Sequence, residues 1–174
     1  DRIALLSFDT KAFLEWPLSA DHDALVYRLR HIGTGGGTRI SSGIIAGLEH
    51  LRSLGQNPGA IIIVSDGSSE ITPEEKKDIE TNLGATRFYW IWIESGEADD
   101  LAEQFGQYVK SLGGQVLRGK IAHLGEMFAQ IDQLEASPVI WRQQVTTVYE
   151  FGILPQLALL GLLLAGLTNQ LREV

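Results

Sequence analysis

One run of eight residues, 60–67, restricts the fold of this chain more than any other feature. Its sequence is Ala-Ile-Ile-Ile-Val-Ser-Asp-Gly, which is apolar and β-branched, too short for a typical helix, and ended by an Asp-Gly pair. Such a run is typical of a strand that is buried on both faces of a parallel sheet. Asp66 then lies at the carboxyl end of the strand, where ligands bind in open α/β sheets. Asp-Gly is also a common turn pair, so a simple turn stays an alternative interpretation.

Strand-like and helix-like segments alternate along the rest of the chain. The first two strands are expected to form a hairpin at a sheet edge. The later alternation predicts a Rossmann-like α/β domain, with a mostly parallel sheet and helices on both faces. The predicted strands, besides that of 60–67, are 3–8, 12–14, 87–93 and 115–117, and the predicted helices are 21–32, 40–51, 73–84, 99–112 and 124–134.

Charge and cysteine content exclude several classes of function. The 174 residues include 14 Lys and Arg against 22 Asp and Glu, which gives a formal charge of −8, and they contain no basic run. Nucleic-acid binding is therefore not expected. Because the chain has no cysteine, it can form no disulfide, no thiolate zinc site and no cysteine nucleophile.

Residues 151–171 form an uncharged, leucine-rich stretch of 21 residues, about the length that crosses a bilayer. Apolar side chains occupy every face of this stretch, which favours a membrane helix over a buried amphipathic helix. We therefore expect one domain at 1–147, a transmembrane helix at 148–171 and a short tail at 172–174. Because the first residue is Asp1 and a strand-like run follows at once, we also expect the sequence to be part of a longer protein.

A glycine-rich loop at 33–38 precedes the second predicted helix. It has the spacing of neither phosphate-binding loop. Gly37-Thr38-Arg39 stands where a Walker loop has Gly-Lys-Ser/Thr, and Thr38 stands where the dinucleotide fingerprint has its third glycine. Nucleotide binding is therefore not expected. The hydroxyl of Thr38 and the carboxylate of Asp66 remain, and oxygen ligands of this kind suit Mg²⁺ or Ca²⁺.

A serine hydrolase would need a nucleophile, a base and an orienting acid in a recognisable arrangement. No serine lies in a Gly-x-Ser-x-Gly elbow, and histidines between polar residues of predicted helices are typical of solvated positions. The acidic pairs Glu74-Glu75 and Asp99-Asp100 open helices, where they complement the helix dipole. The side chains considered for hydrolase chemistry are Ser41, Ser42, Ser65, Ser68, His22, His31, His50 and His123.

Four blocks of the sequence, in their order and spacing, resemble the von Willebrand factor A domain. They are Asp1 to Phe8 (DRIALLSF), Trp16 to Asp21 (WPLSAD), Gly35 to Ile44 (GGGTRISSGI) and Ile61 to Gly67 (IIIVSDG). The resemblance covers the chain to about residue 140.

The remainder resembles the bacterial membrane-anchored subgroup that occurs beside MoxR-type ATPases. This subgroup includes the Bat aerotolerance proteins and the A-domain proteins of methanol-oxidation operons. The likeness rests on Gly113-Gly114-Gln115-Val116, on a final helix that ends in the run Ile131 to Glu135, and on the closing apolar segment.

The resemblance implies a metal-ion-dependent adhesion site. In the family this site uses an Asp-x-Ser-x-Ser loop after the first strand, a Thr from a second loop and an Asp from a third, and Thr38 and Asp66 match the last two. No Asp-x-Ser-x-Ser occurs in this sequence. Bound Mg²⁺, or Ca²⁺ or Mn²⁺, is therefore expected only if residues upstream of Asp1 complete the site. The expected partner-binding residues are Gly36, Gly37, Ser41, Gly67 and Ser68.

The missing loop implies a missing strand, because the loop follows the first strand of the family. That strand lies in the middle of the family's sheet, between the strands that correspond to 3–8 and 61–64. The resemblance therefore implies an N-terminally truncated A domain.

The resemblance also implies a non-enzymatic, membrane-anchored interaction module. Its metal would bind a carboxylate of a protein partner. The partners would be a MoxR-type AAA+ ATPase system and the enzyme that this system helps to mature, such as methanol dehydrogenase. The expected location is the bacterial inner membrane, with the domain in the periplasm. The alternative is a structural membrane subunit whose domain packs against sister domains without metal.

Overall fold

A computed structural model of the chain describes residues 2–33, 35–55, 59–94, 96 and 99–135. The chain divides into two units, Asp1–Ala136 and Ser137–Val174, and all described residues belong to the first unit. The predicted transmembrane helix at 148–171 and the tail at 172–174 thus lie outside the described residues. Within the described part, no helix has the length and apolar character needed to cross a bilayer.

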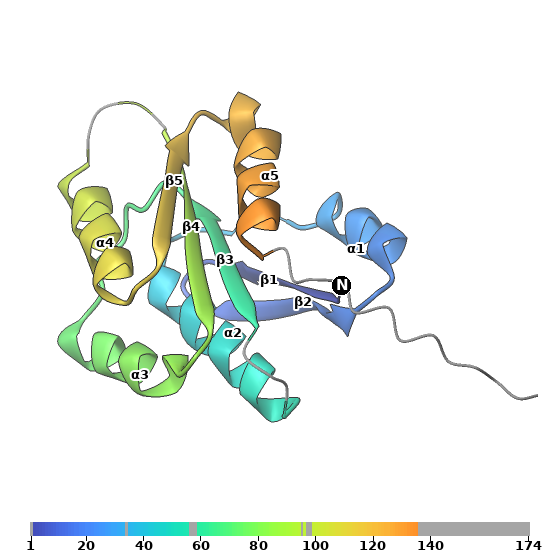
Figure 1. Cartoon of the computed structure of the whole chain (residues 1–174), viewed down its shortest axis with the longest axis horizontal. Coiled ribbons are helices and arrows are strands. Elements are labelled where there is room, and N and C mark those ends of the chain that lie inside the picture. Colours follow the sequence, from blue (N-terminus) through green and yellow to red (C-terminus); the bar gives the residue numbers. More distant parts are fainter. Residues whose placement is uncertain (1, 34, 56–58, 95, 97–98, 136–174) are drawn as a thin grey trace, which may run out of the picture. The chain divides into compact units, whose positions relative to one another are not determined.

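A three-stranded parallel sheet forms the centre of the first unit (Figure 1). It consists of β3 (Ala60–Ser65), β4 (Arg87–Ile93) and β5 (Gln115–Gly119), in the order β3-β4-β5. In its register Ile62 lies opposite Tyr89, which lies opposite Gln115 on the other side. β4 is therefore the central strand.

Helices cover both faces of this sheet, as predicted. The larger core includes side chains of α2 (Ile40–Ser53), α3 (Pro73–Leu83) and α4 (Asp100–Ser111). A smaller core on the opposite face includes side chains of α5 (Leu124–Glu135), which follows a 3₁₀ turn at Ile121–His123. The predicted α/β class is confirmed.

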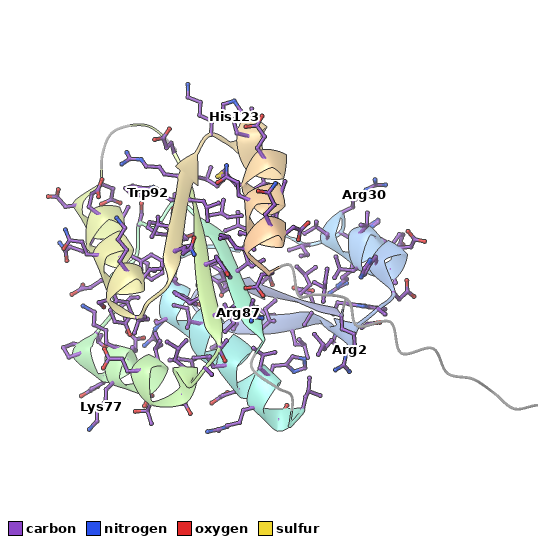
Figure 2. The ribbon with its side chains drawn as sticks, viewed as in Figure 1. Arg2, Arg30, Lys77, Arg87, Trp92 and His123 are labelled. Atoms are coloured by element: carbon purple, nitrogen blue, oxygen red, sulfur yellow. The ribbon has the colours of Figure 1, made fainter. Side chains whose placement is uncertain are left out.

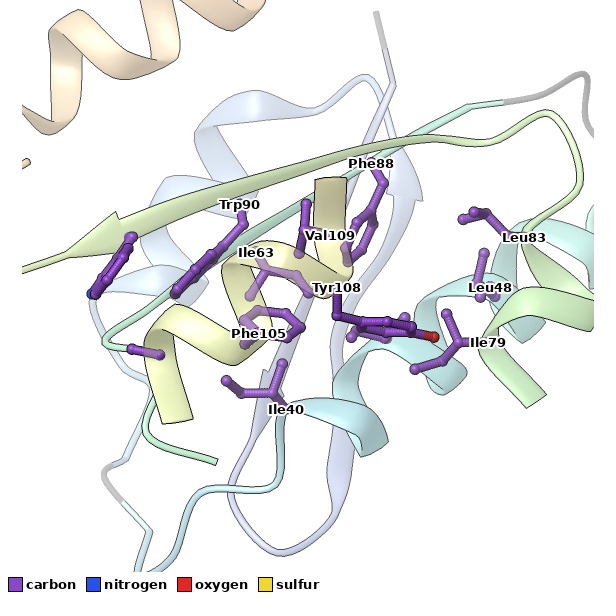
Figure 3. Packing of buried hydrophobic residues seen from close by; sticks show 13 residues of the cluster. Ile40, Leu48, Ile63, Ile79, Leu83, Phe88, Trp90, Phe105, Tyr108 and Val109 are labelled. Atoms are coloured by element: carbon purple, nitrogen blue, oxygen red, sulfur yellow. The ribbon is translucent and has the colours of Figure 1, made fainter. Parts of the chain in front are cut away.

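Burial divides β4 into two sets of side chains, because successive residues of a strand point to opposite faces. Phe88, Trp90 and Trp92 belong to the larger core, whereas Tyr89 and Ile91 belong to the smaller one. The helical residues of the larger core include Ile40, Ile44, Leu48, Ile79, Leu83, Phe105, Tyr108 and Val109 (Figure 3).

β1 (Ile3–Phe8) and β2 (Ala12–Ser19) form the predicted antiparallel hairpin. β2 extends five residues beyond the predicted strand at 12–14 and contains Pro17. Proline has no N–H to donate, so it is tolerated at a sheet edge or where the register is irregular, and the pairing shifts between Ile3 and Leu6. In the described residues the hairpin is a sheet of its own, separate from the parallel sheet, and does not pair with its edge. No described strand lies between β1 and β3 to join them.

β3 is partly exposed, which corrects the prediction of a strand buried on both faces. Ile63 is only 5% exposed, but Ile62 and Val64 are 38% and 40% exposed. The physical reason is that β3 is an edge strand among the described residues, and α5 packs against β4 instead.

α2 packs against both sheets through two glycines one turn apart. A Cβ atom on Gly43 would lie 2.7 Å from Cδ1 of Phe8 in β1, and one on Gly47 would lie 3.4 Å from Cδ1 of Ile61 in β3. Only a residue without a side chain allows the approach of Phe8. The hairpin and the parallel sheet therefore share one supporting helix.

Three predicted boundaries need adjustment. α1 (His22–Leu29) is shorter than the predicted 21–32, since the chain leaves the helix after Leu29 to form the glycine loop. β5 extends to Gly119, two residues beyond the predicted end. The predicted capping box at the start of α3 is confirmed, with Thr72 as N-cap and Glu75 as its partner.

Candidate functional site

Three loops meet at the N-terminus of α2. The backbone N–H of Arg39 donates to the carbonyl oxygen of Asp9, in the β1–β2 turn, at 2.7 Å. The next N–H, of Ile40, donates to Oγ of Ser69, in the loop after β3, at 3.3 Å. Two successive N–H groups therefore join the glycine loop to the other two loops.

Thr38 is exposed and directly precedes Arg39 and Ile40, whose N–H groups form these two bonds. The loop before it packs closely on the β1–β2 turn: a Cβ atom on Gly35 would overlap the carboxylate of Asp9, and one on Gly37 would lie 2.8 Å from Cγ2 of Thr10. Gly37 also has a φ of +103°, which favours glycine. Backbone packing therefore sets the position of Thr38.

Asp66 follows β3 and is half-buried, and its Oδ1 accepts the N–H of Ser68 at 3.2 Å. Between them, Gly67 has a φ of +84°, and a Cβ atom there would lie 2.5 Å from Cζ2 of Trp90. The hydroxyl of Ser68 donates to the carboxylate of Asp99, the N-cap of α4, and lowers the pKa of that carboxyl below its usual value. The Asp66 loop is thus held by the central strand and by α4.

Glu75 reaches the same region, although the sequence indicated only a role at the start of a helix. Its Oε1 accepts hydrogen bonds from Oγ of Ser41 at 2.7 Å and from Nε of Arg39 at 2.8 Å, and its Oε2 accepts the N–H of Thr72 at 2.8 Å. Burial opposes ionisation, but these hydrogen bonds outweigh it and lower the pKa of Glu75 to about 2. No local pattern could have revealed the contact, because Ser41 lies 34 residues away in sequence.

A polar rim continues along the carboxyl ends of β4 and β5. The guanidinium of Arg118 lies 4.0 Å from the ring centroid of Trp92, and it pairs with Glu94 at 2.8 Å and with Glu103 at 3.0 Å. Figure 2 shows Trp92 at the carboxyl end of β4 and Arg87 at its opposite end. A cavity of about 20 Å³, room for about one water molecule, is lined by Asp66, Ser68, Trp92, Glu94, Asp99 and Arg118.

The two predicted metal ligands differ in what they offer. Asp66 supplies a carboxylate and Thr38 an exposed hydroxyl, oxygen donors of the kind that Mg²⁺ prefers. Among residues 2–135, as far as they are described, no three His, Cys, Asp or Glu side chains are grouped so that they could hold a metal ion. The donors therefore fit such an ion in kind but do not fill its coordination sphere.

The five predicted partner-binding residues fall into two groups. Gly36, Gly37 and Ser68 are exposed and stay predictions as contact residues. Ser41 is fully buried and bonded to Glu75, and Gly67 is buried against Trp90. These two residues pack beneath the loops in the protein interior, and neither presents a side chain to a partner.

The serines considered for hydrolase chemistry have partners other than histidine. Ser41 donates to Glu75, Ser42 donates to the carbonyl oxygen of Arg39, and Ser65 accepts from Nε1 of Trp90 at 3.1 Å. Ser68 donates to Asp99. These hydroxyls serve loop and helix geometry and give no support to a catalytic triad.

Comparison with known proteins gives structural likeness only. No protein-family model matches the sequence, and no curated protein matches it. Two solved structures have a similar fold with a TM-score of 0.59 and 16% sequence identity. One is an aerotolerance-related membrane protein from Bacteroides fragilis, and the match covers 78% of this chain and 80% of that chain. The other is the conserved hypothetical protein BatB from Bacteroides thetaiotaomicron, with 78% of each chain covered. At this identity the likeness shows a shared fold.

Proposed function

We propose that this chain is a membrane-anchored, non-enzymatic interaction module that binds a protein partner through a divalent cation held by Thr38 and Asp66. The observation that carries the proposal is the junction of their two loops. Ile40, two residues after Thr38, is bonded to Ser69, three residues after Asp66. This bond joins the loop that carries the Thr38 hydroxyl to the loop that carries the Asp66 carboxylate, which supports a shared site.

The cation would supply the attraction that the domain itself lacks for an acidic group. The chain has a formal charge of −8, so a partner carboxylate is repelled unless a positive charge intervenes. Hard divalent cations such as Mg²⁺ are often bound by one or two protein oxygens and keep several waters. An exchangeable water position would then accept the carboxylate of the partner.

The proposed location and partners have two supports of different kinds. The fold resembles that of a protein described as an aerotolerance-related membrane protein and that of a conserved hypothetical protein, BatB. The uncharged segment at 151–171 would provide the anchor, in the inner membrane with the domain in the periplasm. A MoxR-type ATPase system is the partner that the sequence resemblance implies, with maturation of an enzyme such as methanol dehydrogenase as its purpose.

Co-purification with the MoxR-type ATPase of the same organism tests this proposal. We expect complex formation in Mg²⁺, loss in EDTA, and recovery when Mg²⁺ is restored. Asp66→Ala should abolish recovery, whereas Asp78→Ala, which removes a carboxylate from an exposed position of α3, should not. Binding that persists in EDTA and in Asp66→Ala would contradict the metal mechanism.

A metal-independent structural subunit is the second candidate. The observation in its favour is that the three loops are already joined by hydrogen bonds of the protein, from Arg39 to Asp9 and from Ile40 to Ser69. A site that is held without an ion can serve as a fixed contact surface. This candidate predicts a complex that is indifferent to EDTA.

A further inference from the structure

We propose that Glu75 is a positioning residue of this site, which holds the Thr38 loop and the Asp66 loop together by binding the first residues of α2. The inference rests on the proposed function and deepens it, since it names a residue that controls the site without being a ligand. Glu75 lies in α3, 36 residues from Arg39 in sequence.

The contacts of Glu75 connect the two loops directly. Oε1 accepts from Arg39, through Nε at 2.8 Å and Nη2 at 2.7 Å, and Arg39 is the residue after Thr38. Oε2 accepts from the N–H of Thr72, at the end of the loop that begins with Asp66. One carboxylate therefore joins both ligand-bearing segments.

These contacts are stronger than the other link between the loops. The bond from Ile40 to Ser69 is 3.3 Å long and joins neutral groups. Charge-assisted hydrogen bonds are roughly twice as strong as neutral ones, and the bonds to Glu75 are 2.7 to 2.8 Å long. Loss of the Glu75 charge should therefore loosen the start of α2 more than loss of the Ser69 hydroxyl.

Burial makes the arrangement specific to Glu75. Its side chain is 12% exposed, and Ser41 beneath it is 0% exposed. Glutamine replaces one of the two carboxylate oxygens by an NH2 donor, so either Ser41 and Arg39 or the N–H of Thr72 lose their acceptor. A donor left without its acceptor in this place is costly, so the start of α2 should shift. Glu74, the preceding residue, is exposed and offers a control at the same helix terminus.

The test is the affinity of the full-length protein for Mn²⁺, counted from the electron paramagnetic resonance signal of the free ion. Glu75→Gln should raise the dissociation constant about tenfold or more. Glu74→Gln removes the same charge from the neighbouring position and should change it less than twofold. Thr72→Ala removes the side-chain cap of α3 but leaves both bonds from Arg39 and Ser41 to Glu75. It should lower the melting temperature and keep the Mn²⁺ affinity.

The outcomes separate this inference from the proposed function. If the unmodified protein binds no Mn²⁺, the proposed metal function fails and the positioning role fails with it. If the unmodified protein binds Mn²⁺ and Glu75→Gln binds it as well as Glu74→Gln does, the positioning role alone is overturned. It is also overturned if Thr72→Ala weakens Mn²⁺ binding as much as Glu75→Gln, because general loss of helix stability then explains both.

Discussion

The phenolic hydroxyl of Tyr89 donates a hydrogen bond of 2.6 Å to Oε1 of Glu135, the last residue of α5. Arg87 pairs with the other carboxylate oxygen, also at 2.6 Å. Burial, with the bond to Glu135, raises the pKa of Tyr89 above its usual value. The contact fixes the C-terminal end of α5 to the amino end of β4, at the opposite end of the strand from Trp92 and the polar rim (Figure 2).

Removal of the Tyr89 hydroxyl should destabilise the domain without affecting the candidate site. Tyr89→Phe is expected to lower the free energy of unfolding by about 1 to 2 kcal/mol, because the carboxylate of Glu135, a charged acceptor, loses the hydrogen bond that the hydroxyl donates. Urea denaturation measures this change. Tyr27→Phe, at a side chain that is 68% exposed, is the control and should have almost no effect. Equal effects of the two variants would contradict the importance of the bond.

Gly67 should tolerate no side chain. In Gly67→Ala the new Cβ atom would lie 2.5 Å from Trp90 and 2.9 Å from Ala102, in a backbone conformation that alanine disfavours. We expect a loss of about 3 kcal/mol in the free energy of unfolding. Gly84 also has a positive φ, of +54°, but open space around it, so Gly84→Ala should cost only the backbone strain, about 1 to 2 kcal/mol. Thermal unfolding of both variants gives the comparison, and a Gly67→Ala protein as stable as Gly84→Ala would show that the loop can move away from Trp90.

The Glu75 carboxylate should make stability depend on acid pH. Its pKa is lowered from 4.5 to about 2 by the fold, so the folded state favours the ionised form. The contribution, on the order of 1 to 3 kcal/mol, is fully present above the unfolded pKa and is lost as the pH falls from about 4.5 to about 2. Denaturant unfolding at a series of pH values should therefore show the difference between the unmodified protein and Glu75→Gln shrinking over this window. A difference that is constant from pH 6 to pH 2 would exclude the ionised contact.

β3 should behave as an edge strand in hydrogen exchange. Among the described residues β1 pairs only with β2 and β3 only with β4, and both rest on α2. A cavity of about 330 Å³ beside β1 is lined by Ser7, Phe8, Asp9, Phe13, Glu15, Gly33 and Gly35. Hydrogen exchange should therefore be at least tenfold faster at the β3 amides that face away from β4 than at the amides of the central strand β4. Equal exchange at these two sets of amides would contradict an unpaired edge of β3.

The sequence predicted the parallel sheet and its helices because local patterns determine them. Three of these patterns can be recognised from the local sequence alone: the apolar run at 60–65, the aromatic run at 87–93 and the capping box at Thr72. The extent of β2 was missed, since a proline ordinarily argues against a strand and only the edge position of Pro17 makes it acceptable. The exposure of Ile62 and Val64 was not predicted, because the apolar sequence of a strand does not indicate whether other strands and helices cover it.

The proposed ligands of the candidate site can be picked out in the sequence, but the residues that hold their loops cannot. Thr38 and Asp66 stand at recognisable places, after a glycine loop and after a strand. The bonds that hold their loops join residues far apart in sequence, such as Ile40 with Ser69 and Arg39 with Glu75, and no local pattern encodes them. Ser41 is buried and bonded to Glu75 in α3. The sequence around Ser41 does not indicate this contact, so Ser41 was predicted as a residue of the partner surface.

Calorimetric titration of Mg²⁺ into the full-length protein tests the central proposal most directly, because it needs no partner. We expect saturable binding of one ion per chain, with affinity reduced at least tenfold in Thr38→Val and lost in Asp66→Asn, while both variants keep their folded circular dichroism spectrum. Absence of binding in the unmodified protein, or equal binding in all three proteins, would contradict a metal site formed by Thr38 and Asp66.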